Sequence, residues 1–232
     1  MNYEEVISRL RALGKAEHRD GMAHFGISTG SALGISIPEL RRLAREVGRD
    51  HDLAGRLWAS GIHEARILAT LIDVPSEVSE EQMERWAADF DSWDIVDGAC
   101  GNLFDRTRWA WDKAMEWSRR EEEYVKRAAF ALMAYLAIHD KKAGSERFVA
   151  FLPVIEREAW DGRNFVKKAV NWALRQIGKR DFALNAAAIE SARRILAQGS
   201  APARWIARDA LRELEGAPMQ ARLAASSKRA AS

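Results

Sequence analysis

Apolar residues recur every three or four positions along most of the chain, and short polar or glycine-containing breaks interrupt this pattern. That period is typical of amphipathic helices, and no stretch sustains the alternation expected of a strand. Pro38, Pro153 and Pro202 lie near predicted helix starts or turns, where proline is tolerated. The pattern predicts helices over residues 2–14, 16–24, 38–47, 51–59, 63–73, 79–88, 92–104, 108–119, 123–138, 144–157, 162–178, 183–197 and 203–215.

The predicted helices are short and follow one another in pairs. This favours a solenoid of stacked αα-hairpins with roughly 35–45 residues per repeat, whose concave face suits an extended ligand. A compact helical bundle with a closed core is the alternative. We therefore expect an all-α αα-hairpin solenoid that forms one domain over residues 1–216, and a flexible tail over residues 217–232.

The amino-acid composition supports an all-α globular protein and indicates its cellular compartment. Apolar residues make up 47% of the chain and charged residues 30%, which is typical of a globular protein, and Ala, Leu, Arg and Glu favour helix. The single cysteine, Cys100, excludes a disulfide framework and a cysteine-based metal cluster. The first fifteen residues read as an amphipathic helix, and no apolar run is long enough to span a membrane. We expect a cytoplasmic protein with no membrane partner.

Charge is distributed unevenly along the chain. Residues 160–232 hold 14 Lys and Arg against 6 Asp and Glu, whereas residues 1–159 hold 22 against 28. A basic C-terminal third is what a protein that binds a polyanion would carry. The alternative is that these cations belong to ordinary solvated helix faces.

The helix predicted over residues 162–178 has an unusual outward face. At spacings of 4, 3 and 4 positions, this face carries Lys168, Trp172, Arg175 and Lys179. Arginine forms bidentate contacts with phosphate and lysine supplies a point charge, so the pattern predicts a concave cationic face that contacts the phosphates of an extended ligand. The alternative is an indole packed across a neighbouring helix, beside solvated cations. The opposite, apolar arc comprises Val166, Val170, Ala173, Leu174 and Ile177.

The stretch "DFDSWDIVDGACGNLF" places carboxylates inside an apolar helical run. Asp94 is near the helix start, where a carboxylate favours the helix dipole, and we interpret it as structural. Asp97 is one turn from Trp93, so the two are neighbours on one face. For Asp97 the alternative is a carboxylate that satisfies a neighbouring helix end or an arginine. The buried stripe is predicted to comprise Ile95, Val96, Ala99 and Leu103, and the second face Trp93, Asp97, Cys100 and Phe104.

The helix predicted over residues 123–138 buries one apolar stripe and presents Arg127 on its other side. Ala131, Ala134 and Tyr124 share that side, and small residues would let a phosphodiester backbone approach the guanidinium closely. The alternative is a surface arginine with no ligand. The predicted stripe comprises Val125, Ala129, Leu132 and Leu136.

Five segments, in this order along the chain, resemble the bacterial DNA alkylation-repair glycosylase family (AlkD-like), whose fold is built from HEAT-like repeats. They are "LGISIPELRRLAR" (33–45), "HEARILA" (63–69), "SWDIVD" (92–97), "VKRAAFAL" (125–132) and "FVKKAVNWALRQIGK" (165–179). The resemblance implies hydrolysis of the N-glycosidic bond of N3- and N7-alkylated purines in duplex DNA, without metal or cofactor. It also implies a monomer in the bacterial cytosol or nucleoid.

The resemblance further implies roles for single residues. Its essential carboxylate falls on Asp97, the indoles of its cleft on Trp93 and Trp172, and its DNA-contacting arginines on Arg127 and Arg175. There are two departures from the family pattern. A lesion-contacting tyrosine falls on Phe25, which keeps the ring and loses the hydroxyl, and a lysine is replaced by Tyr135, which weakens one phosphate contact.

Two other functions remain open at this point. One is a non-catalytic paralogue that binds bent or branched DNA, against which the carboxylate of Asp97 argues because phosphates gain nothing from it. The other is a scaffold for protein partners, which would predict an apolar rather than a cationic face.

Overall fold

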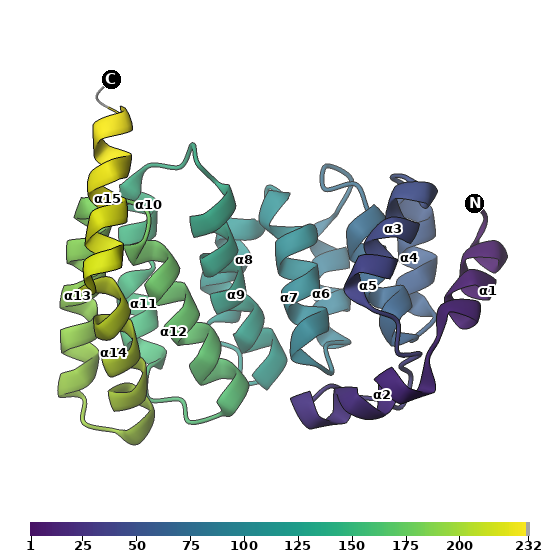
Figure 1. Cartoon of the computed structure of the whole chain (residues 1–232), viewed down its shortest axis with the longest axis horizontal. Coiled ribbons are helices and arrows are strands. Elements are labelled where there is room, and N and C mark those ends of the chain that lie inside the picture. Colours follow the sequence, from purple (N-terminus) through teal and green to yellow (C-terminus); the bar gives the residue numbers. More distant parts are fainter. Residues whose placement is uncertain (231–232) are drawn as a thin grey trace. The chain divides into compact units, whose positions relative to one another are not determined.

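Every regular element in residues 1–230, the part of the chain that the structure describes, is helical in the computed structural model (Figure 1). The side chains of Phe25 and of residues 228–230 lie outside that description. The chain divides into two compact units, Met1–Trp109 and Ala110–Ser232. Within residues 1–230, none of the helices combines the length and the apolar character that crossing a membrane requires.

In the first unit the α-helices begin and end within two residues of the predicted bounds, and short 3₁₀ turns follow α2 and α7. Helix α5 packs against α3, α4 and α7. Side chains of Ser36, Asp50 and Ser79 cap α3, α4 and α6. The elements are α1 (Tyr3–Leu13), α2 (Ala16–Met22), η1 (Ala23–Phe25), α3 (Ile37–Val47), α4 (His51–Ala59), α5 (His63–Ile72), α6 (Glu80–Ala88), α7 (Trp93–Asn102) and η2 (Phe104–Arg106).

The second unit contains the long helices α9 and α12–α15 together with the shorter α8, α10 and α11. Helix α9 packs against α8 and α12, and α12 packs in turn against α13 and α14. The apolar stripe predicted for residues 162–178 is buried, as is the one predicted for residues 123–138. The elements are α8 (Ala110–Trp117), α9 (Glu123–His139), α10 (Ser145–Val149), α11 (Leu152–Glu158), α12 (Asn164–Gly178), α13 (Phe182–Ala197), α14 (Ala201–Leu214) and α15 (Ala217–Ala230).

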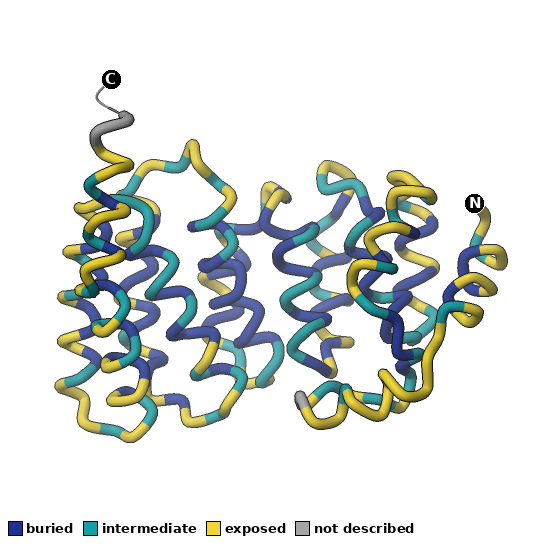
Figure 2. Tube along the Cα trace, viewed as in Figure 1, coloured by how far each residue is buried: buried dark blue, intermediate teal, exposed yellow. Residues whose placement is uncertain are grey.

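Helix α9 is buried on more sides than the sequence pattern predicted. Ala131 and Ala134, which were expected to face outward, are fully buried, and Figure 2 shows dark blue along most of this helix. The reason is that α8 and α12 both pack against it. The small side chains therefore allow neighbouring helices, rather than a ligand, to approach the α9 backbone.

The single helix predicted over residues 144–157 is divided into α10 and α11. Pro153 stands in the first turn of α11, where its missing N–H needs no partner. If α10 and α11 were one continuous helix, the ring of Pro153 would clash with the carbonyl of Val149, the last residue of α10. The helical period persists across this break, which is why the pattern alone predicted one element.

Residues 217–230 form helix α15 rather than the predicted flexible tail. Met219 and Leu223, one turn apart, are 8% and 2% exposed, so this helix has a small apolar face. Gln220 Nε2 donates to the carbonyl of Leu214 at 2.7 Å, which joins the start of α15 to the end of α14. The segment offers only these two large apolar residues among alanines and polar residues, too few for a convincing period.

Candidate functional site

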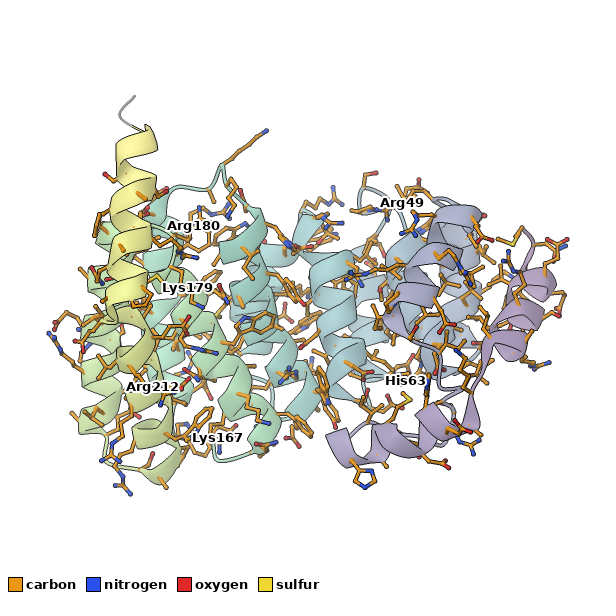
Figure 3. The ribbon with its side chains drawn as sticks, in the orientation of Figure 1. Arg49, His63, Lys167, Lys179, Arg180 and Arg212 are labelled. Carbon is orange, nitrogen blue, oxygen red and sulfur yellow. The ribbon has the colours of Figure 1, made fainter. Side chains whose placement is uncertain are left out.

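The start of α7 is held by a buried histidine of α5. His63, labelled in Figure 3, is 1% exposed. Its Nε2 lies 2.8 Å from Asp94 Oδ2. Asp94 also accepts hydrogen bonds from the hydroxyl of Ser92 and, at 3.0 Å, from the amide of Ile95. Asp94 is therefore structural, as predicted, whereas no role was predicted for His63.

The two partners shift each other's titration. Burial alone would raise the pKa of Asp94, but the hydrogen bond and charge of His63 outweigh burial and lower that pKa. Burial likewise works against protonation of His63, as does its buried Nδ1, which lacks a hydrogen-bond partner among the described residues. The carboxylate of Asp94 prevails at 2.8 Å and raises the pKa of His63.

Glu64, the residue after His63, fixes the loop that precedes α3. Glu64 is 1% exposed, and it accepts the amides of Leu33 at 2.7 Å, Gly34 at 2.6 Å and Ile35 at 3.2 Å. Gly34 has φ +82°, and a Cβ atom there would collide with the carbonyl of Lys15. The pair His63–Glu64 thus ties both the loop before α3 and the start of α7 to one helix end.

On the helix positioned in this way, Asp97 and Trp93 are both half-buried and lie one turn apart. Cys100 and Phe104 were predicted on the same face, but both are fully buried. The α-helix ends at Asn102, so Phe104 belongs to η2 and packs 6.1 Å from the Trp86 ring. The partly accessible section of this face is therefore formed by Trp93 and Asp97.

In the second unit the predicted cationic face of α12 meets carboxylates of α14. Arg175 Nη1 lies 2.5 Å from Glu213 Oε2, and Lys179 pairs with the same carboxylate. Burial alone would raise the pKa of Glu213, but Lys179 and Arg175 lower it. Lys168 is exposed. The face is thus less cationic than predicted, because α14 covers part of it with acidic residues.

Trp172 is half-buried and packs edge-on against Tyr135 of α9, with ring centroids 4.9 Å apart and an interplanar angle of 82°. This geometry agrees with the alternative in which the indole lies across a neighbouring helix. It also shows what the departure at Tyr135 does: the phenol ring supports the indole from α9.

Arg127 was predicted to lie on the surface, but it is buried. It is 6% exposed, and its Nη1 donates to the carbonyl of Phe165 at 2.9 Å. The preceding residue, Lys126, is also buried and pairs with Glu158 at 2.9 Å. Packing of α9 against α12 buries the guanidinium, which joins the second turn of α9 to the start of α12.

The predicted lesion contact Phe25 has a side chain outside the described residues. Among residues 1–230, no group of three or more His, Cys, Asp or Glu side chains is placed to hold a metal ion. The candidate groups are therefore a half-buried carboxylate beside an indole in the first unit, and cations with a second indole in the second unit.

Comparison with known proteins places this geometry in a family. Residues 6–214 match the family model described as DNA alkylation repair enzyme. A solved structure of "a new family of proteins related to the HEAT-like repeat DNA glycosylases with affinity for branched DNA structures" matches with a TM-score of 0.76 and 21% identity, over 84% of this chain and 83% of that one. This likeness confirms the all-α HEAT-like repeat fold. No curated protein matches the chain. Because the family model covers most of its length, the chain belongs to the DNA alkylation repair enzyme family.

Proposed function

We propose that this chain is a DNA glycosylase that hydrolyses the N-glycosidic bond of cationic N3- and N7-alkylated purines in duplex DNA, with Asp97 as the catalytic residue. The observation that carries the proposal is the pair of half-buried Asp97 and Trp93 on α7, a helix whose start is locked by His63. Asp94, the other carboxylate of α7, is engaged in that lock. Membership of the repair family supports the same reaction.

Such a lesion needs little catalytic assistance at the departing base. An N3- or N7-alkylated purine already carries a positive charge, so it leaves as a neutral molecule and needs no general acid. The barrier lies in the positive charge that develops on the deoxyribose as the bond stretches. A carboxylate about 4 Å away stabilises that charge by roughly 4 kcal/mol at an effective dielectric constant near 20. This corresponds to about a thousandfold in rate.

Asp97 can serve this reaction in a second way, by orienting the attacking water. The indole of Trp93 lies one turn away and places the lesion and its sugar through contacts worth about 0.5–2 kcal/mol. Part of that contact is lost once the base is neutral, so the ring assists placement more than bond cleavage. The prediction that Trp172 and Phe25 contact the lesion belongs to the same proposal.

The DNA-backbone contacts are proposed for the second unit. Lys168 is exposed and contacts phosphate directly. Arg175 and Lys179 retain N–H groups beyond those bound to Glu213, so they contribute from a partly neutralised position. Arg127 is buried, and it supports this surface by fixing the start of α12 through the carbonyl of Phe165.

A second candidate function is a protein that binds branched DNA without cutting any bond. It is favoured by one observation: the solved structure with the same fold is described as having affinity for branched DNA structures. In that function Asp97 would have no catalytic task, and its carboxylate would oppose the approach of a phosphate.

One experiment separates the two candidates. The purified protein is incubated with duplex DNA methylated at guanine N7, with a four-way junction as a parallel ligand, and free 7-methylguanine is measured by chromatography. Release of the base from the duplex above the spontaneous rate is expected. Binding of the junction with no release of base would instead select the second candidate.

A further inference from the structure

A basic pocket lies in the second unit, where the ends of α9 and α12 meet α15. Its volume is about 350 Å³, near the lower end of the range of roughly 300–1,000 Å³ usual for ligand sites. Lys179 and Arg180 follow the end of α12, beside α15 (Figure 3). No carboxylate stands among the described residues that line it. Its polar wall consists of Lys141, Gln176, Lys179, Arg180, Arg222 and Ser226.

Two guanidinium groups of this wall are fixed by backbone carbonyls. Arg180 donates from Nη1 to Ala137 at 2.7 Å and from Nη2 to Ala143 at 3.3 Å. Arg222 of α15 donates from Nη2 to the carbonyl of Lys179 at 2.7 Å. A carbonyl is neutral, so each group is held in one position and still keeps its full charge and further N–H donors. The pocket is therefore preorganised for an anion.

Arg175 and Arg194, also in the second unit, are bound to carboxylates instead. Arg194 forms two hydrogen bonds to Glu156, at 2.7 and 3.0 Å, and Arg175 pairs with Glu213. A carboxylate cancels most of the field of such a cation, whereas a carbonyl does not. The lining residue Lys179 does pair with Glu213, which leaves Arg180, Arg222 and Lys141 as the main source of positive potential.

The surroundings of Arg180 leave its guanidinium without a full set of hydrogen-bond acceptors. Its Nε is buried and has no hydrogen-bond partner among the described residues. Burial lowers the pKa of this guanidinium, and the charges of Asp140 and Asp181 only partly oppose that effect. A partly desolvated cation gains when an anion takes the place of the missing water. Arginine forks fit phosphate oxygens in particular.

We propose that this basic pocket binds a backbone phosphate of DNA, which makes α15 part of the DNA-binding surface. The inference rests on the proposed function in requiring a DNA ligand. The exposed side chains of Lys141, Arg222 and Ser226 leave the pocket open to a macromolecule, and the hydroxyl of Ser226 adds a neutral phosphate donor.

The pocket extends the DNA contact along α12. Lys168 and Lys179 are eleven positions apart, which is about 16 Å along a helix axis at about 1.5 Å per residue. The pocket and Lys168 would therefore contact different phosphates of the duplex.

The test compares two double variants with the same loss of charge in the full-length protein. Lys141→Gln/Arg222→Gln removes two cations of the pocket. Lys142→Gln/Arg193→Gln removes a neighbouring lysine and an arginine that do not line it. Affinity for an undamaged 20-base-pair duplex is measured from about 50 to 200 mM salt, where each lost phosphate contact lowers the slope of log K against log salt by about 0.9.

We expect the pocket variant to lose about tenfold in affinity at low salt and about one unit of slope, and the matched variant to stay within twofold of wild type. Lys141→Gln alone, in an exposed turn, should lose affinity in the same direction. This single variant replaces the double variant in the test if thermal unfolding shows that the Arg222 change destabilises the protein. Equal losses in both double variants, or no loss in either, would overturn the proposal.

The result is separable from that for base release. A normal salt slope in the pocket variant, together with base release by the wild type, rejects the pocket and keeps the glycosylase. A reduced slope in a protein that releases no base keeps the pocket and rejects the glycosylase. Inorganic phosphate is the third probe: phosphate binding that the pocket variant loses, with duplex affinity unchanged, would assign the pocket to a small anion and overturn the DNA contact.

Discussion

At the residue scale, Asp94 and Asp97 are neighbouring carboxylates of one helix with different surroundings. Asp94 stands in the first turn and meets His63, Ser92 and its own following amide. Asp97 stands one turn later on a half-buried face beside Trp93. Helical periodicity predicted these two positions on the helix from the sequence. It could not predict His63, because the partner of Asp94 comes from a helix some thirty residues earlier and only packing brings the two together.

The pair of His63 and Asp94 should make stability depend on pH. The pKa of His63 is raised, so its contribution is complete below the unfolded value of about 6.5 and is lost as the pH rises through the folded value. The pKa of Asp94 is lowered, so its contribution is present above about 3.9 and is lost as the pH falls through the folded value. The pair therefore contributes most between about pH 4 and 6.5.

Asp94→Asn removes the charge and leaves the shape. We expect the free energy of unfolding to fall by about 1.5–3 kcal/mol at pH 5.5, the usual contribution of a hydrogen bond between charged groups, and by less once the pH has risen through the raised pKa of His63. Urea unfolding of wild type and variant across pH measures the difference, with Asp52→Asn, an exposed aspartate of α4, as the control. A difference that grows with rising pH would contradict the assignment.

At the scale of elements, the bounds of most helices could be predicted, and the misses have physical causes. One predicted helix is divided because Pro153 cannot continue it, and a predicted tail is helical because Met219 and Leu223 pack on the rest of the unit. The exposure of helix faces was predicted less accurately than the bounds of the helices. Amphipathic patterns identify one buried face, and they cannot show that α14 supplies Glu213 to α12 or that α8 and α12 both cover α9.

The contact between α12 and α14 gives a prediction about DNA affinity. Glu213 holds Arg175 and Lys179, so Glu213→Gln should free Lys179 for phosphate and leave Arg175 with the more distant Asp209, at 3.6 Å. We expect a severalfold gain in affinity for undamaged duplex and a steeper salt dependence, because more counterions are displaced on binding. Glu215→Gln, which changes an exposed glutamate paired with Arg193, is the matched control. The same gain in both variants would show a general charge effect, and no gain in either would mean that the α12 cations do not contact DNA.

At the scale of the whole molecule, the five segments that resemble the repair glycosylases are connected physically within each unit. In the first unit, His63 and Glu64 of "HEARILA" bind Asp94 of "SWDIVD" and the amides of "LGISIPELRRLAR". In the second, Arg127 of "VKRAAFAL" binds the carbonyl of Phe165, the first residue of "FVKKAVNWALRQIGK". Much of the resemblance therefore lies in residues that position α7 and α12. Trp93 and Asp97 stand on the first of these helices, and Lys168, Trp172 and Arg175 stand on the second.

The central claim is that the carboxylate of Asp97 stabilises the charge that develops on the sugar. Its most direct test is the single-turnover rate of 7-methylguanine release from methylated duplex at saturating protein, measured for wild type, Asp97→Asn and Asp91→Asn, an exposed aspartate just before α7. We predict that Asp97→Asn slows release about a thousandfold with duplex affinity unchanged, and that Asp91→Asn stays near wild type. Release by Asp97→Asn at the wild-type rate would contradict the account.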